Sequence, residues 1–391
     1  MRRGPWHQFG DRSQKLVLEQ LQQGVGVGVV ISPRDLSHTN AKDYAAQYHG
    51  LGAEVVIDQQ FYVPDFANTN LDSYPTKRYR LAASHLRQLT DQDLVGLATA
   101  MQQINSDLAA DALVAPALVY EAGRPDIVSL NARLFATAKG VGDTLGIPTL
   151  ATVVLGHSVV SADQTVRDVL SQATSLNADG WYYAFEFGSE RLPSSRERVL
   201  RCCMAGLTLA CTGKPVLHAY AGPMGLLSLG FGATGAAIGH SQNLWHFSRG
   251  RWGPAQPQGG GGDAPARFFS APLWGTIVHP DETAQLPQAL RNQILSNSPF
   301  TTPWTRWQAN KHLVFTICST VADLASQTDP RLCAQAAISV LNTAVSLHAR
   351  IAALGVLLMD GTNTYQANWV NAVNDLLSQH GTDFDYLDLL P

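Results

Sequence analysis

The fold can be read outward from residues 53–65, Ala-Glu-Val-Val-Ile-Asp-Gln-Gln-Phe-Tyr-Val-Pro-Asp. Residues 55–57 are β-branched, and such a run predicts a parallel strand that is buried on both faces. Asp58 and Gln60 then lie on one face, because strand side chains alternate. A carboxylate at the end of a buried strand must be hydrogen-bonded, paired or functional. We therefore expect the rim of an active site here.

Strands and helices alternate along the chain around this stretch. The pattern predicts strands at residues 24–31, 53–57, 112–119, 148–155, 181–187, 215–221 and 233–239. Residues 267–273 provide a candidate eighth strand. Eight parallel strands with alternating helices predict an α/β fold, a closed (β/α)8 TIM barrel. A doubly wound open sheet is the alternative, but the first predicted strand is not followed by the glycine fingerprint of that fold.

The barrel is expected to occupy residues 1–280, with a long insertion at residues 63–111 and a Gly-rich loop at residues 249–266. Residues 281–391 have a helical pattern and are expected to form a C-terminal extension packed on the barrel. Four consecutive glycines at residues 259–262 hold a fixed backbone only at a large entropic cost. They predict a mobile loop on the catalytic face.

The composition limits the classes of function. The 391 residues are 45% hydrophobic and carry a net charge of −4, which argues against a strongly basic nucleic-acid footprint over the whole molecule. The N-terminal residues lack the apolar centre of a signal peptide, and no apolar run reaches the length of a membrane span. We therefore expect a cytoplasmic protein that makes no membrane contact. The five cysteines form no CxxC pair, so neither a disulfide framework nor a zinc-cluster motif is expected.

The candidate catalytic residues follow from strand parity. In the strand at residues 181–187, the bulky Tyr183, Phe185 and Phe187 suit the helix-facing side. Tyr182, Ala184 and Glu186 are then expected to face inward. The same argument places His218 and Tyr220 inward on the strand at residues 215–221. We expect Asp58, Glu186 and His218 to converge as the catalytic group. Two carboxylates can serve as acid and base, or as nucleophile and acid, when their environments differ; a buried structural hydrogen bond is the alternative for each residue.

Substrate-binding residues are expected at the same strand ends. Residues 232–241 are similar to the seventh strand of phosphate-binding barrels, where a glycine lets ligand oxygens approach backbone N–H groups; tight packing of small residues is the alternative. The expected substrate-binding residues are Arg34, Gln60, Tyr62, His157, Tyr220, Gly239, His240 and Ser241.

No cofactor is specified by the sequence. Residues 230–235 match GxGxxG, but they precede a strand, whereas a nucleotide-cofactor fingerprint follows one. His157, Glu186, His218 and His240 lie near strand ends, and imidazole with carboxylate can hold a divalent ion. Because no HxH or HExxH pair is present, we expect no metal site, with such an ion as the alternative.

Residues 57–64, Ile-Asp-Gln-Gln-Phe-Tyr-Val-Pro, resemble the strand end of tRNA-guanine transglycosylases, where an Asp and a downstream aromatic residue and Pro line the base pocket. These barrel enzymes exchange a purine-like base on a nucleic acid through a carboxylate nucleophile. The resemblance implies that Asp58 contacts the base or takes part in acid–base chemistry. The zinc cluster of that family has no counterpart here, because Cys318 and Cys333 stand alone. Its nucleophilic Asp has no clear match either, so Glu186 would have to substitute.

Three functions are compatible with these patterns. The first is glycosyl transfer or hydrolysis on a nucleoside, nucleic acid or related sugar, with Asp58 and Glu186 as the carboxylate pair. The second is a non-catalytic binding component that engages a protein or nucleic-acid partner through C-terminal helices around residues 304–312. The third is a phosphate-binding lyase or isomerase with its ligand near Gly239.

Overall fold

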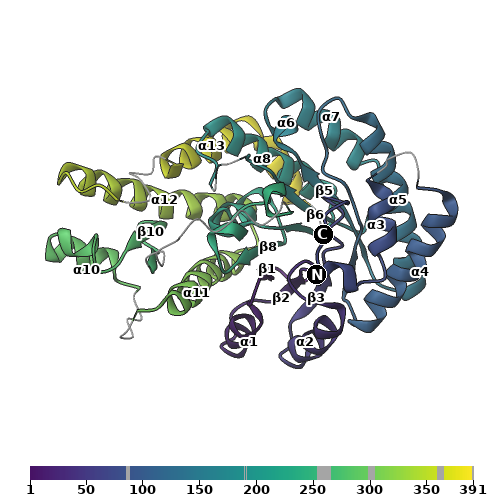
Figure 1. The fold of residues 1–391 in the computed structure, drawn as a ribbon. Helices are drawn as coiled ribbons and strands as arrows, with labels where there is room; N and C mark the ends of the chain where they lie inside the picture. The colour runs from purple at the N-terminus through teal and green to yellow at the C-terminus, as the bar shows by residue number, and fades with distance from the viewer. Residues whose placement is uncertain are drawn as a thin grey trace.

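A computed structural model describes residues 1–84, 89–188, 190, 192–252, 266–297, 304–358 and 365–389. Eight parallel strands close into a barrel, which confirms the predicted (β/α)8 architecture (Figure 1). The strands follow one another around the ring in chain order. They are β1 (Gly4–Gln8), β2 (Gly28–Ile31), β3 (Glu54–Ile57), β4 (Ala112–Val114), β5 (Thr149–Leu155), β6 (Gly180–Phe185), β7 (Val216–His218) and β8 (Gly235–Gly239).

The first strand of the barrel was not predicted. β1 pairs with β2 through Trp6 and Gly28, and with β8 through Gly4 and Gly235, so it closes the ring. Its sequence, Gly-Pro-Trp-His-Gln, has no β-branched run, yet all five residues are buried. Tertiary context therefore overrides local β-propensity at this strand.

The predicted eighth strand at residues 267–273 is wrong. Arg267–Ser270 forms β9, which pairs antiparallel with β10 (Gly275–Val278) in a separate two-stranded sheet. An apolar, aromatic run satisfies either a barrel strand or a two-stranded ribbon, because the run itself does not specify its partner. The Gly-rich segment at residues 259–262, expected to be a mobile loop, lies outside the described residues.

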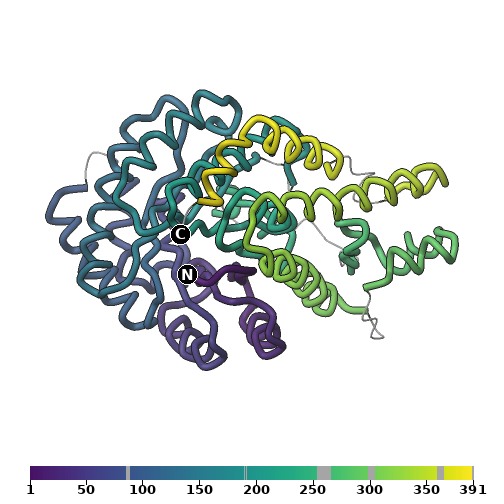
Figure 2. The backbone as a smooth tube through the Cα atoms, turned by 180° about the vertical axis from the view of Figure 1, so that it is seen from behind, coloured from purple at the N-terminus to yellow at the C-terminus, as the bar shows by residue number. Residues whose placement is uncertain are grey.

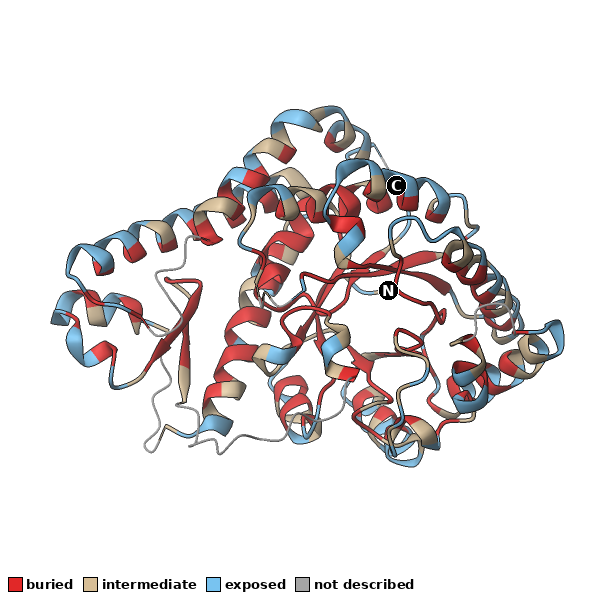
Figure 3. Cartoon of the chain, turned by 45° about the horizontal axis from the view of Figure 1, so that its top comes forward, coloured by how far each residue is buried: buried red, intermediate tan, exposed pale blue. Residues whose placement is uncertain are grey.

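Helices surround the barrel, with their buried faces toward it and their exposed faces toward solvent (Figure 3). The helices that connect the strands include α1 (Gln14–Gln22), α2 (His38–Gly50), α4 (Asp91–Asp107), α5 (Pro125–Leu145), α6 (His157–Val160), α7 (Asp163–Ala173), α8 (Arg196–Ala210) and the short α9 (Gly225–Ser228). Sequence signals set several boundaries: a capping box between Thr90 and Asp93 begins α4, and Gly146 in the left-handed conformation ends α5. The insertion after β3 adds a short 3₁₀ turn, α3 (Lys77–Ala83) and α4.

The C-terminal helices play two different parts. α11 (Arg306–Ala325) packs against β1 and β8 and covers the seam where the barrel closes. β9, β10, α10 (Gln288–Ile294) and α12 (Pro330–Ala353) extend away from the barrel and share a hydrophobic cluster that includes Phe268, Ile277 and Leu347. Figure 2 shows this projection from behind, in green and yellow-green. α13 (Tyr365–Gln379) packs on α8 and α12, and α14 (Gly381–Leu387) follows it.

α12 is long and apolar enough to cross a membrane by length and composition, and no other helix in the described ranges meets both conditions. In this structure one side of α12 is buried, with Cys333, Leu341 and Ile351 packed in the protein. A core helix of a globular protein passes the same test.

The barrel interior is a packed core rather than a channel. Inward-facing residues from successive strands form one hydrophobic cluster, which includes Trp6, Val30, Val56, Val114, Leu150, Val154, Tyr182, Leu217 and Ala237. Residues of the opposite parity, such as Tyr183 and Phe185, belong to the cluster between strands and helices. Because the core fills the barrel, chemistry is confined to the rim where the strands end.

Candidate active site

Asp58 lies immediately after β3 and is almost fully buried, with 1% of its surface exposed. Its carboxylate accepts four hydrogen bonds. Oδ1 accepts from the Tyr62 hydroxyl at 2.8 Å and from the Gln60 backbone N–H at 3.0 Å. Oδ2 accepts from the Tyr182 hydroxyl at 3.0 Å and the Tyr220 hydroxyl at 3.1 Å. We call Asp58 and these three tyrosines the Asp58 cluster.

Burial dominates the electrostatics of the Asp58 cluster. Desolvation raises the pKa of Asp58, and the hydrogen bonds from Tyr62, Gln60, Tyr182 and Tyr220 offset only part of that rise. Burial, followed by the nearby charge of Asp58, raises the pKa of each tyrosine in the cluster well above its usual range. The phenols are therefore neutral hydrogen-bond donors, while the carboxyl takes up a proton at higher pH than a solvated aspartate does.

Two residues with unusual backbone conformations build the cluster. Gln60 and Tyr220 both have φ of +52°, in the left-handed region that non-glycine residues seldom adopt. At Gln60 the turn directs the backbone N–H back to Asp58. At Tyr220 it follows the end of β7, and the Tyr220 N–H donates to Gln8 Oε1 at 3.3 Å. Such conformations cost about 1–3 kcal/mol each and concentrate at functional sites.

Aromatic side chains from the segment after β8 cover the cluster. The Phe247 ring lies 4.9 Å from the Tyr62 ring and 5.7 Å from the Tyr220 ring, measured between centroids. Trp252 lies 5.9 Å from Tyr62 in an edge-on arrangement. This cover explains why Asp58 is shielded from water and why desolvation outweighs its hydrogen bonds.

Glu186 lies just beyond β6 at the same rim but has a different environment. Its Oε1 accepts from the Arg249 backbone N–H at 3.0 Å, and its Oε2 accepts from Arg249 Nε at 2.8 Å and Nη2 at 2.5 Å. Arg249 also pairs with Glu121 at 2.5 Å. Glu186 is thus held by a cation that it shares with Glu121, whereas Asp58 has only neutral donors around it.

The inward orientation predicted for His218 is wrong. Its ring stacks on Tyr183 at 4.7 Å and lies near Phe185 and Phe231, which belong to the helix-facing cluster. Its Nδ1 is 2.7 Å from Ser228 Oγ, and burial lowers the pKa of His218 to about 3. β7 points Leu217 inward and His218 outward, and the left-handed backbone at Tyr220 then breaks the alternation. His218 is therefore a structural residue outside the Asp58 cluster.

The other predicted residues fall into two groups. Arg34, Gln60, Tyr62 and Tyr220 lie in or beside the Asp58 cluster. His157 begins α6, His240 follows β8, and Ser241 precedes a short 3₁₀ turn; among the described residues, no hydrogen bond or ion pair joins any of the three to Asp58. Gly239 is explained by packing, because a Cβ there would overlap the side chain of Leu244. The alternative of tight packing thus accounts for this glycine.

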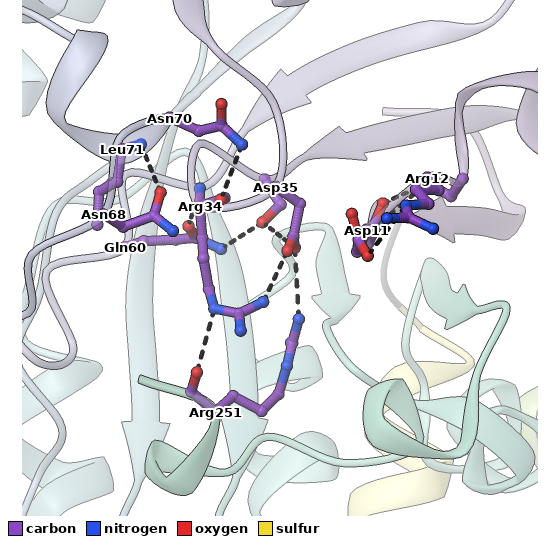
Figure 4. Close-up of polar contacts among 12 residues, drawn as sticks. Asp11, Arg12, Arg34, Asp35, Gln60, Asn68, Asn70, Leu71 and Arg251 are labelled. Carbon is purple, nitrogen blue, oxygen red and sulfur yellow. Dashed lines mark hydrogen bonds and ion pairs between the residues drawn. The ribbon is translucent and has the colours of Figure 1, made fainter. Parts of the chain in front are cut away.

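A polar network connects the cluster to the segments that follow β2 and β7; Figure 4 shows the part around Gln60, Arg34 and Asp35. Gln60 Oε1 accepts from the Arg34 N–H at 2.9 Å, and Gln60 Nε2 donates to Ser32 Oγ at 2.9 Å and to the Tyr220 hydroxyl at 3.3 Å. Asp35 accepts from Ser32 Oγ at 2.8 Å. Gln60, which follows β3, therefore links the segment after β2 to the segment after β7.

Several residues of the site escaped sequence reasoning. Asp35, Arg249 and Arg251 approach the rim from loops, and no periodic pattern marks a loop side chain as part of a site. Tyr182 is predicted to face inward by strand parity, but it was not assigned a role. Tyr220 follows β7 and has a left-handed backbone, so the regular alternation of strand side chains does not extend to it. The convergence of Tyr182 and Tyr220 on Asp58 could therefore not be predicted from the sequence.

Within the described residues, no three His, Cys, Asp or Glu side chains are placed to hold a metal ion together. Of the residues considered for a metal, His218 faces the helices and Glu186 is engaged by Arg249.

Comparisons with known proteins add little to this geometry. No protein-family model and no curated protein match the chain. Among solved structures, a glycerol uptake operon antiterminator-related protein from Thermotoga maritima is similar at 14% identity, over 63% of this chain and 99% of that chain, with a TM-score of 0.31. A likeness this distant carries no argument about function. The chain is a (β/α)8 barrel whose candidate site is the Asp58 cluster.

Proposed function

We propose that the chain is a barrel enzyme that transfers or hydrolyses a glycosyl group on a nucleoside, nucleic acid or related sugar, with Asp58 as the reacting carboxyl group. The observation that carries this proposal is the buried Asp58 carboxyl, held at the rim by phenols from three segments of the chain. A carboxyl group whose pKa is raised by burial keeps its proton to higher pH than a solvated carboxyl does, which suits a general acid.

The chemistry of glycosidic bonds matches a carboxyl of this kind. Cleavage needs a proton on the leaving oxygen or base and compensation for the positive charge that develops on the sugar ring. We assign the proton to Asp58, with the tyrosine hydroxyls fixing the direction of the carboxyl. Glu186 is the second carboxylate of the pair. Because Arg249 holds both of its oxygens, it contributes negative charge at the rim rather than a free nucleophile.

The resemblance of residues 57–64 to tRNA-guanine transglycosylases supports a base-exchanging reaction within this class. In such a reaction the glycosidic bond to one base breaks and a bond to another base forms. Water in place of the second base would give hydrolysis. The aromatic cover formed by Phe247 and Trp252 limits water near Asp58 and supports transfer.

The test compares isosteric variants on a panel of nucleosides, nucleic acids and glycosides, with release of free base or reducing sugar as the assay. Asp58→Asn removes the proton-transferring group but keeps the shape, so turnover should fall by at least about 100-fold. Asp91→Asn is the matched control, because Asp91 is a fully solvated carboxylate on α4, away from the barrel rim. Turnover by Asp58→Asn at the wild-type rate would refute the assignment of Asp58.

A groove on α11 favours a second candidate, a non-catalytic binding component. The groove has a volume of about 520 Å³ and lies between α1 and α11, with Trp307 and Phe315 at its edge. These side chains are 40% and 42% exposed, and exposed aromatic residues are favoured at interfaces. Copurification of a protein or nucleic acid that is lost in Trp307→Ala and retained in Asp58→Asn would favour this function over the enzymatic one.

A further inference from the structure

Two arginines from distant parts of the sequence meet beside the Asp58 cluster. Arg34 follows β2, and Arg251 lies in a 3₁₀ turn after β8. Both guanidinium groups reach Asp35: Arg34 Nη1 is 2.6 Å from Oδ1, and Arg251 Nη2 is 3.4 Å from Oδ2 (Figure 4). Arg34 Nε also donates to the Arg251 carbonyl at 3.1 Å. The two side chains therefore share one carboxylate.

The charges of this group do not cancel. Arg34 and Arg251 contribute two positive charges, and Asp35 contributes one negative charge, part of whose hydrogen-bonding capacity is taken by Ser32 Oγ at 2.8 Å. The nearest further ion pair in Figure 4, Asp11 with Arg12, is solvent-exposed and balances itself. Counted over these three side chains, one positive charge is in excess, and an anionic ligand at this position would balance it.

Arg251 provides a second observation that favours an anion at this position. Its side chain is only 11% exposed, and its Nη1 is buried with no hydrogen-bond partner among the residues that the structure describes. Buried guanidinium N–H groups normally find an acceptor, because leaving one unpaired is costly. The free Nη1 therefore points to an acceptor that binds here, and the planar fork of a guanidinium suits phosphate or carboxylate oxygens.

The position of the arginines couples them to the reacting group. The Arg251 guanidinium carbon lies 5.7 Å from the centroid of the Tyr220 ring, and Tyr220 donates to Asp58. Gln60 bridges the Arg34 backbone and Tyr220. An anion bound by these arginines would thus lie beside the Asp58 cluster. One substrate molecule would then carry both this anionic group and the glycosidic bond that Asp58 protonates.

We propose that Arg34 and Arg251 form an anion subsite, and that the substrate is a sugar or nucleoside carrying a phosphate or carboxylate group. This inference rests on the proposed function for the identity of the substrate, but the anion subsite itself does not. The competing role for Arg251 is purely structural. Its guanidinium carbon also lies 5.4 Å from the Trp252 ring, so it could serve to hold the segment after β8 in place.

The experiment measures binding of inorganic phosphate and of acetate by calorimetry and thermal shift at constant ionic strength, with chloride as the balancing salt. We expect phosphate or acetate to bind and raise the thermal midpoint of the wild type. Arg251→Gln should weaken that binding by about tenfold or more, because one charge-assisted contact is lost. Arg12→Gln is the matched control, because Arg12 lies near the same rim and, in the described part of the chain, forms an ion pair with exposed Asp11; it should bind as the wild type does. Arg34→Gln tests the same subsite if Arg251→Gln does not fold.

The outcomes separate the alternatives. Tighter binding of phosphate identifies a phosphate ester as the ligand, and tighter binding of acetate identifies a carboxylate. No binding of either anion by the wild type, or equal binding by wild type, Arg251→Gln and Arg34→Gln, would overturn the proposal and leave Arg251 a structural residue. Comparing the wild type with Asp58→Asn separates this inference from the proposed function. If both proteins bind the anion and neither shows glycosyl turnover, the anion subsite is supported and the glycosyl chemistry is rejected.

Discussion

Tyr182→Phe should destabilise the protein at neutral pH, whereas the same change at the adjacent Tyr183 should not. The Tyr182 hydroxyl donates to the buried carboxylate of Asp58 at 3.0 Å. Phenylalanine keeps the ring and its packing, so the change removes one hydrogen bond and little else. A hydrogen bond to a charged group contributes about 1.5–3 kcal/mol. Because Tyr220 still donates to the same oxygen at 3.1 Å, we expect a loss of about 2 kcal/mol.

Tyr183 provides a closely matched control. It is equally buried and lies next in the same strand, but its hydroxyl has no hydrogen-bond partner among the described residues. Removing a buried hydroxyl that makes no hydrogen bond should leave stability unchanged or raise it. The pair of variants therefore separates the hydrogen bond to Asp58 from the general effect of losing a phenolic oxygen in the core.

The assay is urea unfolding followed by fluorescence, at neutral pH and again at acid pH. We expect the midpoint of Tyr182→Phe to fall by roughly 0.5 M at neutral pH, from the usual dependence of unfolding free energy on urea. Loss of a donor to the charged form raises the pKa of Asp58 further, so the penalty applies when Asp58 is ionised and shrinks once it is protonated. Equal midpoints for the two variants at neutral pH would refute the account of the Asp58 cluster.

Two further predictions concern residues of the rim. Because burial raises the folded-state pKa of Asp58 above its unfolded value, the folded protein binds more protons between those two pKa values, and the unfolding free energy contributed by Asp58 falls as pH rises through that interval. Asp58→Asn should remove this decrease in unfolding free energy. The thermal midpoint of the variant should therefore rise relative to that of the wild type as pH increases. A constant difference between the two midpoints across pH would contradict the raised pKa of Asp58. Gly239→Ala should destabilise the protein by about 1–3 kcal/mol through overlap with Leu244 and leave phosphate affinity unchanged. Chemical unfolding measures the stability, and calorimetry measures the phosphate affinity. A loss of phosphate binding without a loss of stability would instead place Gly239 in the ligand site.

The sequence determined most of the barrel because seven of its strands carry apolar or small-residue runs between helical segments. β1 escaped because its side chains are buried by the barrel interior on one face and by α11 on the other, a property that depends on ring closure rather than on its own composition. β9 was mistaken for a barrel strand because the local pattern of Arg267–Ser270 is the same in either sheet.

The candidate site could be predicted only where strand parity holds. Asp58, Gln60 and Tyr62 lie close together in the sequence, and their contacts follow from the end of one strand. His218 was misplaced because β7 ends there and the next turn is left-handed, which no residue pattern announces. Arg249 and Arg251 reach the rim across long separations in the chain, so their partners emerge only from the folded structure.

The placement of α11 has a consequence for synthesis on the ribosome. All eight barrel strands are complete by Gly239, but the helix that covers β1 and β8 begins only at Arg306. A nascent chain therefore carries a ring of strands with an uncovered apolar seam until the residues through Ala325, the end of α11, have emerged. We expect this interval to be the stage at which the growing polypeptide depends most on chaperones.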